Sequence, residues 1–241
     1  MSAVPLVLLA GMNCTADLWA GCGLDDALTP VLDEESIDAQ VERLLDTLPP
    51  VFALGGLSLG AIVAMALIAR APSRVAGLCL VSTNAKAPTD EQRRSWASWI
   101  DRLDSGESAR SLQESIIDAL LTPRIVADRP DLVARTAAMG ESTGEEILRA
   151  QLRMQATRTD QRPGLRAVRV PTLVVSGAHD TVCPPSFHVE IANEIRGARA
   201  VSMDAGHLLP LVQPAPFGAL VRSWRDRRLT PAGRAAYANG S

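Results

Sequence analysis

The chain has 241 residues, of which 47% are hydrophobic and 21% are charged, and its formal net charge is −3 at pH 7. This composition is typical of a globular protein with a sizeable core, and the small net charge excludes a strong basic field for nucleic acid or an anionic membrane. The apolar runs are too short to cross a bilayer. We therefore expect no nucleic-acid partner and no membrane partner.

Cysteine usage and the first residues bear on metal binding and location. The cysteines include no CxxC pair and have no nearby histidine at zinc-ligand spacing; they are Cys14, Cys22, Cys79 and Cys183. We therefore expect no metal site, no disulfide framework and no cofactor. The first five residues lack the basic region of a signal peptide and lead directly into a predicted strand, so we expect a cytoplasmic protein.

Strands and helices alternate over the first part of the chain. Short, nearly continuous apolar runs predict buried parallel strands at residues 4–10, 51–54 and 75–81, with a stubby strand at 28–32. Apolar residues at helical spacing predict a helix at 36–48, capped by Ser36 and ended by Pro49-Pro50. A second helix, rich in Ala, Ile and Met, is predicted at 61–71.

The pattern changes between residues 85 and 162, where no strand is indicated. Trp96, Trp99, Ile100 and Leu103 form one helical stripe, and further stripes follow at 112–120, 132–136 and 147–152. We interpret this segment as a helical lid inserted into the alternating pattern.

The alternation then resumes, with strands predicted at 172–176 and 198–203 and helices at 187–195 and 208–222. This order predicts an α/β fold, in which helices cover both faces of a mostly parallel sheet. We expect one core domain made of residues 1–84 and 163–228, a helical lid at 85–162, and a frayed tail at 229–241.

A candidate nucleophile lies in the sequence Gly56-Leu57-Ser58-Leu59-Gly60, which reads G-x-S-x-G between a predicted strand and a predicted helix. A serine on such a sharp turn adopts a strained backbone and projects its hydroxyl above the sheet edge. A phosphate-binding P-loop would need a Lys here, and a dinucleotide turn would need an acidic residue about 20 positions on. Neither is present, so we interpret Ser58 as the nucleophile.

A serine nucleophile needs a general base, and the chain offers three histidines. His207 follows the last predicted strand, where a loop at the strands' carboxyl ends reaches the serine. His188 is interpreted as a surface helix residue, and His179 lies on the wrong side of its loop. His207 is therefore the predicted base.

The base needs an orienting carboxylate, and Asp180 follows the predicted strand at 172–176. The chain order Ser58, Asp180, His207 is the one typical of this architecture. Asp204 is the rival, but it precedes His207 by only three residues. Asn84, at another rival position, has no negative charge to stabilise an imidazolium.

Two backbone amides are predicted to form an oxyanion hole. The amide of Leu59 begins a helix, and the amide of Met12 lies in the loop after the first strand. Asn13 either assists through its side chain or forms the turn. For substrate binding we predict Trp96, Trp99 and Leu208, although a lid core is the alternative for the tryptophans.

Taken together, these pieces resemble the α/β-hydrolase superfamily over nearly the whole chain. The residues that carry the resemblance are 6–11 with Trp19, the turn 56–60, Ser-Gly-Ala-His-Asp at 176–180 and Ala-Gly-His at 205–207. Within the superfamily the chain is similar to small lidded carboxylesterases such as the pimeloyl carrier-protein methyl-ester esterases. The resemblance implies a catalytic triad of Ser58, Asp180 and His207, with the Met12 and Leu59 amides as oxyanion hole.

The sequence thus predicts a serine hydrolase that cleaves a carboxylic ester of a small, largely apolar molecule through an acyl-enzyme. Thioester hydrolysis, lactone opening and carbon–carbon bond hydrolysis use the same three groups and stay open. A carrier protein is a further candidate partner that would dock on Arg93-Arg94, although a solvated helix face is the favoured interpretation of that pair. A non-catalytic ligand-binding protein is the alternative from another class, and a complete set of three groups argues against it.

Overall fold

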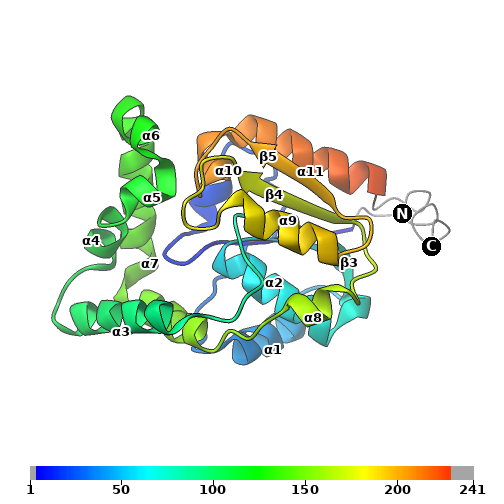
Figure 1. Cartoon of the computed structure of the whole chain (residues 1–241), viewed down its shortest axis with the longest axis horizontal. Coiled ribbons are helices and arrows are strands. Elements are labelled where there is room, and N and C mark those ends of the chain that lie inside the picture. Colours follow the sequence, from blue (N-terminus) through cyan, green and yellow to red (C-terminus); the bar gives the residue numbers. More distant parts are fainter. Residues whose placement is uncertain (1–3, 229–241) are drawn as a thin grey trace.

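A parallel β-sheet forms the centre of the molecule in a computed structural model that describes residues 4–228, without the side chains of residues 227 and 228. The strand order within these residues is β1-β2-β3-β4-β5, and every neighbouring pair is parallel (Figure 1). The strands are β1 (Leu6–Leu9), β2 (Phe52–Leu57), β3 (Val75–Val81), β4 (Thr172–Gly177) and β5 (Arg199–Met203). The predicted α/β architecture with a parallel sheet is confirmed.

One predicted strand is wrong. In place of a strand at residues 28–32, Leu28 makes a single parallel bridge with β1. Its N–H donates to the carbonyl of Leu6 at 2.8 Å, and its carbonyl accepts from the N–H of Leu8 at 2.9 Å. Two residues later Pro30 has no N–H to extend the ladder, so the pairing stops there.

Helices cover both faces of the sheet because neighbouring strand residues point to opposite sides. Val7 and Leu9 pack with one group of helices, whereas Leu6 and Leu8 pack with the other. The first group is α1 (Ile37–Thr47), α2 (Leu59–Arg70), α8 (Arg162–Leu165) and α9 (Pro185–Glu194). The second is the short 3₁₀ helix η1 (Ala16–Trp19), α10 (Leu209–Val212) and α11 (Pro214–Arg228).

The ends of these helices follow local sequence signals. The Ser36 side chain accepts from the N–H of Ala39 and so caps α1, as predicted.

The single terminal helix predicted at 208–222 is instead divided into α10 and α11. Gln213 between them has φ −128° and ψ 62°, since a residue before proline is disfavoured in the helical region.

Every regular element that the structure describes between β3 and β4 is a helix. Figure 1 shows α3 to α7 gathered at one end of the molecule, beyond the sheet. These helices are α3 (Asp90–Asp104), α4 (Ala109–Glu114), α5 (Ile117–Leu121), α6 (Pro123–Asp128) and α7 (Pro130–Ala156). We call residues 85–162 the helical insertion. Its own apolar cluster contains Trp96 and Leu103, which belong to the predicted stripe.

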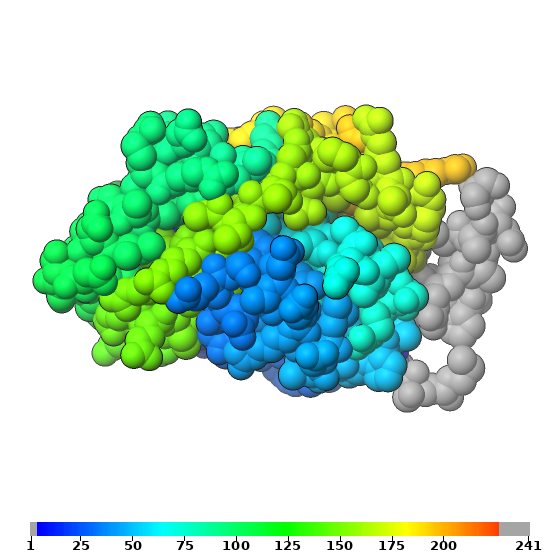
Figure 2. Space-filling view, turned by 90° about the horizontal axis from the view of Figure 1, so that it is seen from below, coloured from blue at the N-terminus to red at the C-terminus, as the bar shows by residue number. Residues whose placement is uncertain are grey.

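The insertion is joined to the sheet layer along α7. In Figure 2 the C-terminal part of α7 runs directly against α1. The N–H of Ile37 donates to Oγ1 of Thr157 at 3.0 Å, and Arg153 forms an ion pair with Glu35. Within α7, Gly144 has φ 75° and ψ 164°, so the helix is kinked at this residue.

No helix among residues 4–228 is long and apolar enough to cross a membrane. The predicted frayed tail, residues 229–241, lies outside the described residues.

Candidate active site

Ser58 lies at the junction of β2 and α2 in a strained backbone conformation. Its φ is 54° and its ψ is −114°, a region that residues with a side chain rarely adopt. The conformation is fixed from both sides. The N–H of Ser58 donates to the carbonyl of Val81 on β3 at 2.9 Å, and the Thr83 hydroxyl donates to the Ser58 carbonyl at 3.1 Å.

The two glycines that flank Ser58 are required by close backbone packing. A Cβ on Gly56 would lie 2.3 Å from the carbonyl carbon of Gly60. A Cβ on Gly60 would lie 2.1 Å from the carbonyl oxygen of Leu9 on the neighbouring strand. Both contacts involve backbone atoms, which cannot rotate away. The G-x-S-x-G pattern is therefore a consequence of how tightly α2 begins against β1 and β2.

Gly60→Ala is consequently expected to destabilise the fold strongly, by roughly 3 kcal/mol or more, because the β1 backbone must shift. Gly164→Ala is the matched control, since a Cβ there meets nothing within 4 Å and its helix α8 favours alanine. Urea unfolding of the two variants measures the difference between their free energies of unfolding. Equal free energies of unfolding for both variants would contradict the packing argument.

His207 and Asp180 form a buried hydrogen-bonded pair. Nδ1 of His207 lies 2.9 Å from Oδ2 of Asp180, and both side chains are almost fully buried. The other carboxylate oxygen, Oδ1, accepts from the N–H groups of Val182 at 2.9 Å and Cys183 at 2.8 Å. The carboxylate is thus held at both oxygens, and it in turn orients the imidazole ring.

Two loops that follow β4 and β5 bring this pair together. A Cβ on Gly177, the last residue of β4, would lie 2.2 Å from the carbonyl oxygen of Gly206, so the end of β4 contacts the loop after β5 through backbone atoms. The N–H of His179 donates to the carbonyl of Ala205 at 3.0 Å. The insertion also contributes, because the carbonyl of Leu120 accepts from the N–H of Leu208 at 3.1 Å.

The rival residues have other hydrogen-bond partners. His179 pairs with Asp204 at 2.8 Å, and both side chains are largely exposed. Asp204 therefore pairs with His179 and not with His207. Asn84 lines the same cavity as Ser58, and its Oδ1 accepts from the N–H of Lys86 at 3.1 Å.

The prediction of His188 as a surface residue is wrong. Its side chain is buried in α9 against the loop after β3, where Nε2 accepts from the N–H of Thr83 at 2.8 Å. Nδ1 lies 3.3 Å from the carbonyl of Pro184. The neutral ring with its proton on Nδ1 satisfies both contacts. Burial lowers the pKa of His188, and the nearby His207 lowers it further, against opposing effects of Pro184 and Asp180.

Acid is therefore expected to destabilise the protein through His188. Its folded-state pKa lies below the unfolded value of about 6.5, so below that pH the unfolded chain binds a proton that the folded chain excludes. The contribution to stability is complete above about pH 6.5 and is lost as the pH falls, by at most about 1.4 kcal/mol per pH unit. His188→Gln, which keeps an acceptor for Thr83, should flatten this loss.

Urea unfolding at pH 7, 6 and 5 measures the effect, and His179→Gln at the surface is the control. If His188→Gln loses stability between pH 7 and pH 5 as steeply as the unmodified chain, His188 is not the responsible group.

A cavity of about 140 Å³ contains both Ser58 and His207 in its wall. Of the predicted substrate-binding residues, Trp96 and Leu208 line it. Trp99 instead packs, half-buried, against the apolar cluster of the insertion and is not among the lining residues. The volume is below the roughly 300–1,000 Å³ of pockets for drug-sized ligands, which favours a small ligand.

The predicted oxyanion amides lie beside Ser58. Leu59 is the first residue of α2, and the first N–H groups of a helix have no partner within it. Met12 lines the cavity with Gly11, whose Cβ position would be 3.6 Å from Cβ of Ser58. The loop after β1 thus lies directly against the serine.

Asn13 ties this loop to the insertion. Its φ is 56°, and its N–H donates to Oε1 of Gln151 on α7 at 2.8 Å. Its side-chain Nδ2 donates to the carbonyl of Ala109 on α4 at 2.9 Å. The Asn13 amides are therefore engaged by the insertion, which leaves the preceding amide, that of Met12, as the candidate donor. Gln151 had no signal in the sequence.

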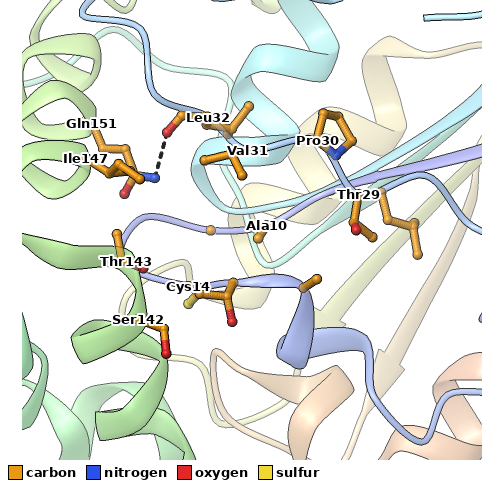
Figure 3. Close-up of a pocket in the computed structure, with 14 residues that line it drawn as sticks. Ala10, Cys14, Thr29, Pro30, Val31, Leu32, Ser142, Thr143, Ile147 and Gln151 are labelled. Atoms are coloured by element: carbon orange, nitrogen blue, oxygen red, sulfur yellow. Dashed lines mark hydrogen bonds between the residues drawn. The ribbon is translucent and has the colours of Figure 1, made fainter.

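A second cavity of about 250 Å³ borders the same loop (Figure 3). Gly11 and Cys14 line both cavities. Figure 3 shows Ile147 and Gln151 of α7 facing the segment that contains Val31 and Leu32. The side chain of Gln151 donates to the Leu32 carbonyl at 2.9 Å. The described residues that line this second cavity carry no charged side chain.

Comparison with known proteins identifies the family. A model of the alpha/beta hydrolase family matches residues 13–220, which is most of the chain. The chain therefore belongs to the alpha/beta hydrolase family, and the resemblance inferred from the sequence is confirmed.

Individual relatives include enzymes with several activities. A pyrrolizixenacetamide deacetylase of Xenorhabdus hominickii is 26% identical over 210 residues, covering 86% of this chain and 77% of that protein. A pimeloyl-[acyl-carrier protein] methyl ester esterase of Neisseria meningitidis is 27% identical over 208 residues, covering 83% of this chain and 63% of that protein. The matched part is thus less than two thirds of the esterase.

Solved structures share the fold. A thermophilic esterase from Thermogutta terrifontis has a TM-score of 0.82 at 24% identity, covering 92% of this chain and 89% of that one. An enol-lactonase from Burkholderia xenovorans has a TM-score of 0.80 at 22% identity, covering 92% of both chains. At these identities the likeness is one of architecture.

Proposed function

We propose that the protein is a serine hydrolase that cleaves a carboxylic ester of a small substrate through an acyl-enzyme. The observation that carries the proposal is one cavity whose wall holds a strained serine on a strand-to-helix turn together with a histidine bonded to a buried carboxylate. The family membership supports hydrolysis, and the relatives include an ester hydrolase.

In the proposed reaction, Ser58 Oγ attacks the carbonyl carbon of the ester while Nε2 of His207 takes the hydroxyl proton. Asp180 holds the Nδ1–H of His207 and stabilises the imidazolium that forms. His207 then gives its proton to the leaving alcohol, and an acyl group stays on Ser58. In the second half, His207 takes a proton from water, and the resulting hydroxide attacks the acyl-enzyme and releases the acid.

The negative oxygen of each tetrahedral intermediate would be bound by the amides of Met12 and Leu59. Such preorganised donors supply much of the rate in acyl transfer, since the loss of one costs roughly a hundredfold or more. The Leu59 amide is supported by its place at the start of α2, where the helix dipole also favours an anion.

Other acyl bonds remain within reach of the same three groups. The relatives named as a deacetylase and an enol-lactonase favour tests of amides and lactones beside esters. Thioesters and carbon–carbon bonds belong in the same panel. Dehalogenases and epoxide hydrolases of this fold use a carboxylate nucleophile, whereas residue 58 is a serine. A carrier protein would meet the exposed Arg94 on α3.

A fluorophosphonate probe tests the proposal directly, because it reacts with an activated serine and leaves a covalent adduct. Intact-protein mass measurement should show one adduct on the unmodified chain and none on Ser58→Ala. Absence of the adduct from a correctly folded chain would overturn the proposal and favour a ligand-binding protein without turnover. An adduct that persists on Ser58→Ala would place the nucleophile elsewhere.

A further inference from the structure

Arg158 is a buried cation in the wall of the cavity that contains Ser58. It follows the end of α7, its exposed fraction is 5%, and it lines the same cavity as His207. Burial lowers its pKa to about 10, an effect to which Arg93 adds. This value is still well above neutral pH, so the guanidinium carries its charge under physiological conditions.

This charge has no counter-ion in the part of the chain that the structure describes. Surface arginines such as Arg102 and Arg162 form ion pairs with carboxylates, but no carboxylate among residues 4–228 lies within salt-bridge distance of Arg158. None of the described residues that line the cavity is acidic either. An uncompensated buried charge is unfavourable, and an anionic ligand would offset that cost.

Neutral groups hold the guanidinium in place. Its Cζ atom lies over the ring of Trp96, 5.3 Å from the ring centroid. Nη1 donates to Oε1 of Gln155 at 3.1 Å. Nη2 makes only long contacts of 3.4 Å, to Oε1 of Gln92 and the carbonyl of Lys86. These long contacts exceed the usual range and are readily exchanged for a better acceptor.

One edge of the guanidinium therefore lacks a well-formed hydrogen bond. Nε is buried and has no hydrogen-bond partner among the described residues. Nε and Nη2 form one side of the guanidinium fork, and this geometry matches the two oxygens of a carboxylate. Gln113 lines the same cavity, and its side chain is hydrogen-bonded to Cys14. The unpaired Nε–H of Arg158 is a donor, so its missing partner is an acceptor.

We propose that Arg158 binds a carboxylate on the substrate, so that the protein prefers small esters that carry a free carboxylate besides the bond to be cleaved. This inference rests on the proposed function, since it names the substrate class of the same cavity. It also changes the expectation of a largely apolar substrate, because one end of the ligand is anionic.

A matched pair of substrates tests the preference. Monomethyl glutarate carries a carboxylate, and the methyl ester of glutaric acid monoamide replaces it by a neutral group of nearly the same shape. The unmodified protein should hydrolyse the carboxylate ester with a kcat/KM roughly 10- to 100-fold higher, the size expected for hydrogen bonds to a charged group. Arg158→Met should bring the ratio close to one, and Arg158→Lys should recover part of it. Arg124→Met, at an exposed position on α6, is the control and should keep the original ratio.

Ligand binding to the unmodified chain keeps the test independent of how the variants fold. Glutaramate, which has one carboxylate, should raise Tm, whereas glutaramide, which has none, should not.

Equal kcat/KM for the two esters in the unmodified chain, with a fluorophosphonate adduct on Ser58, would overturn the role of Arg158 and leave the proposed function intact. Absence of the adduct and of all turnover would overturn the proposed function, and stabilisation by glutaramate that is lost in Arg158→Met would still support the carboxylate site.

Discussion

His207→Ala is expected to lower kcat for ester hydrolysis by about 10⁴-fold or more, because Ser58 then has no base to take its proton. The position of the imidazole supports this expectation. Nδ1 is held by Asp180, which leaves Nε2 as the ring nitrogen that can accept a proton. Steady-state hydrolysis of a short p-nitrophenyl ester measures the loss, and the rate of fluorophosphonate labelling should fall with it.

The chain contains only three histidines, so a complete histidine scan is practical. His179→Ala changes an exposed residue paired with Asp204 and should keep turnover within a few-fold. Unfolding curves establish that each variant is folded. Near-normal turnover by a folded His207→Ala chain would show that another group acts as the base.

Asp180→Asn is expected to lower kcat by about 10⁴-fold without a large change in the fold. Oδ1 of Asp180 accepts from two backbone N–H groups, those of Val182 and Cys183. An asparagine must turn its single oxygen toward these donors, so its NH₂ group faces Nδ1 of His207. The imidazole is then forced to accept at Nδ1 and to carry its proton on Nε2, which prevents it from taking the proton of Ser58.

The same hydrolysis and labelling assays measure this second loss. Asp204→Asn is the matched control, since Asp204 pairs with His179 at the surface and should leave kcat close to its original value. If Asp204→Asn loses activity and Asp180→Asn does not, the two acids exchange their assigned roles.

The fold was readable from the sequence where local signals were strong. β3 matches its predicted residues because it is a continuous apolar run between turn residues. β2 is longer than predicted, since Gly55 and Gly56 suggested a turn. In the structure both glycines belong to the strand. There is no room for a side chain at these positions, since a Cβ on Gly55 would lie 2.7 Å from the Leu8 side chain. Glycine is weak in strands by itself, and the tertiary packing overrides that preference.

Candidate site residues were predictable when a strand or a turn fixed their position. Ser58, Asp180 and His207 follow strands whose carboxyl ends meet at one edge of the sheet. His188 and Arg158 could not be assigned in this way. Their environments come from contacts distant in sequence, such as that of His188 with Thr83 and that of Arg158 with Trp96. Such contacts leave no mark on the residues adjacent in the chain.

The hydrogen bonds of Asn13 have a consequence for how a ligand gains access to Ser58. Its N–H is bound to Gln151 on α7 and its side chain to the Ala109 carbonyl on α4, so one short loop is fastened to two helices. An outward movement of either helix would break one of these hydrogen bonds and free the loop that contains Met12. Under the proposed oxyanion role of the Met12 amide, a widely opened molecule would admit bulky esters but would hydrolyse them slowly. Size selection and turnover would then depend on the same hydrogen bonds.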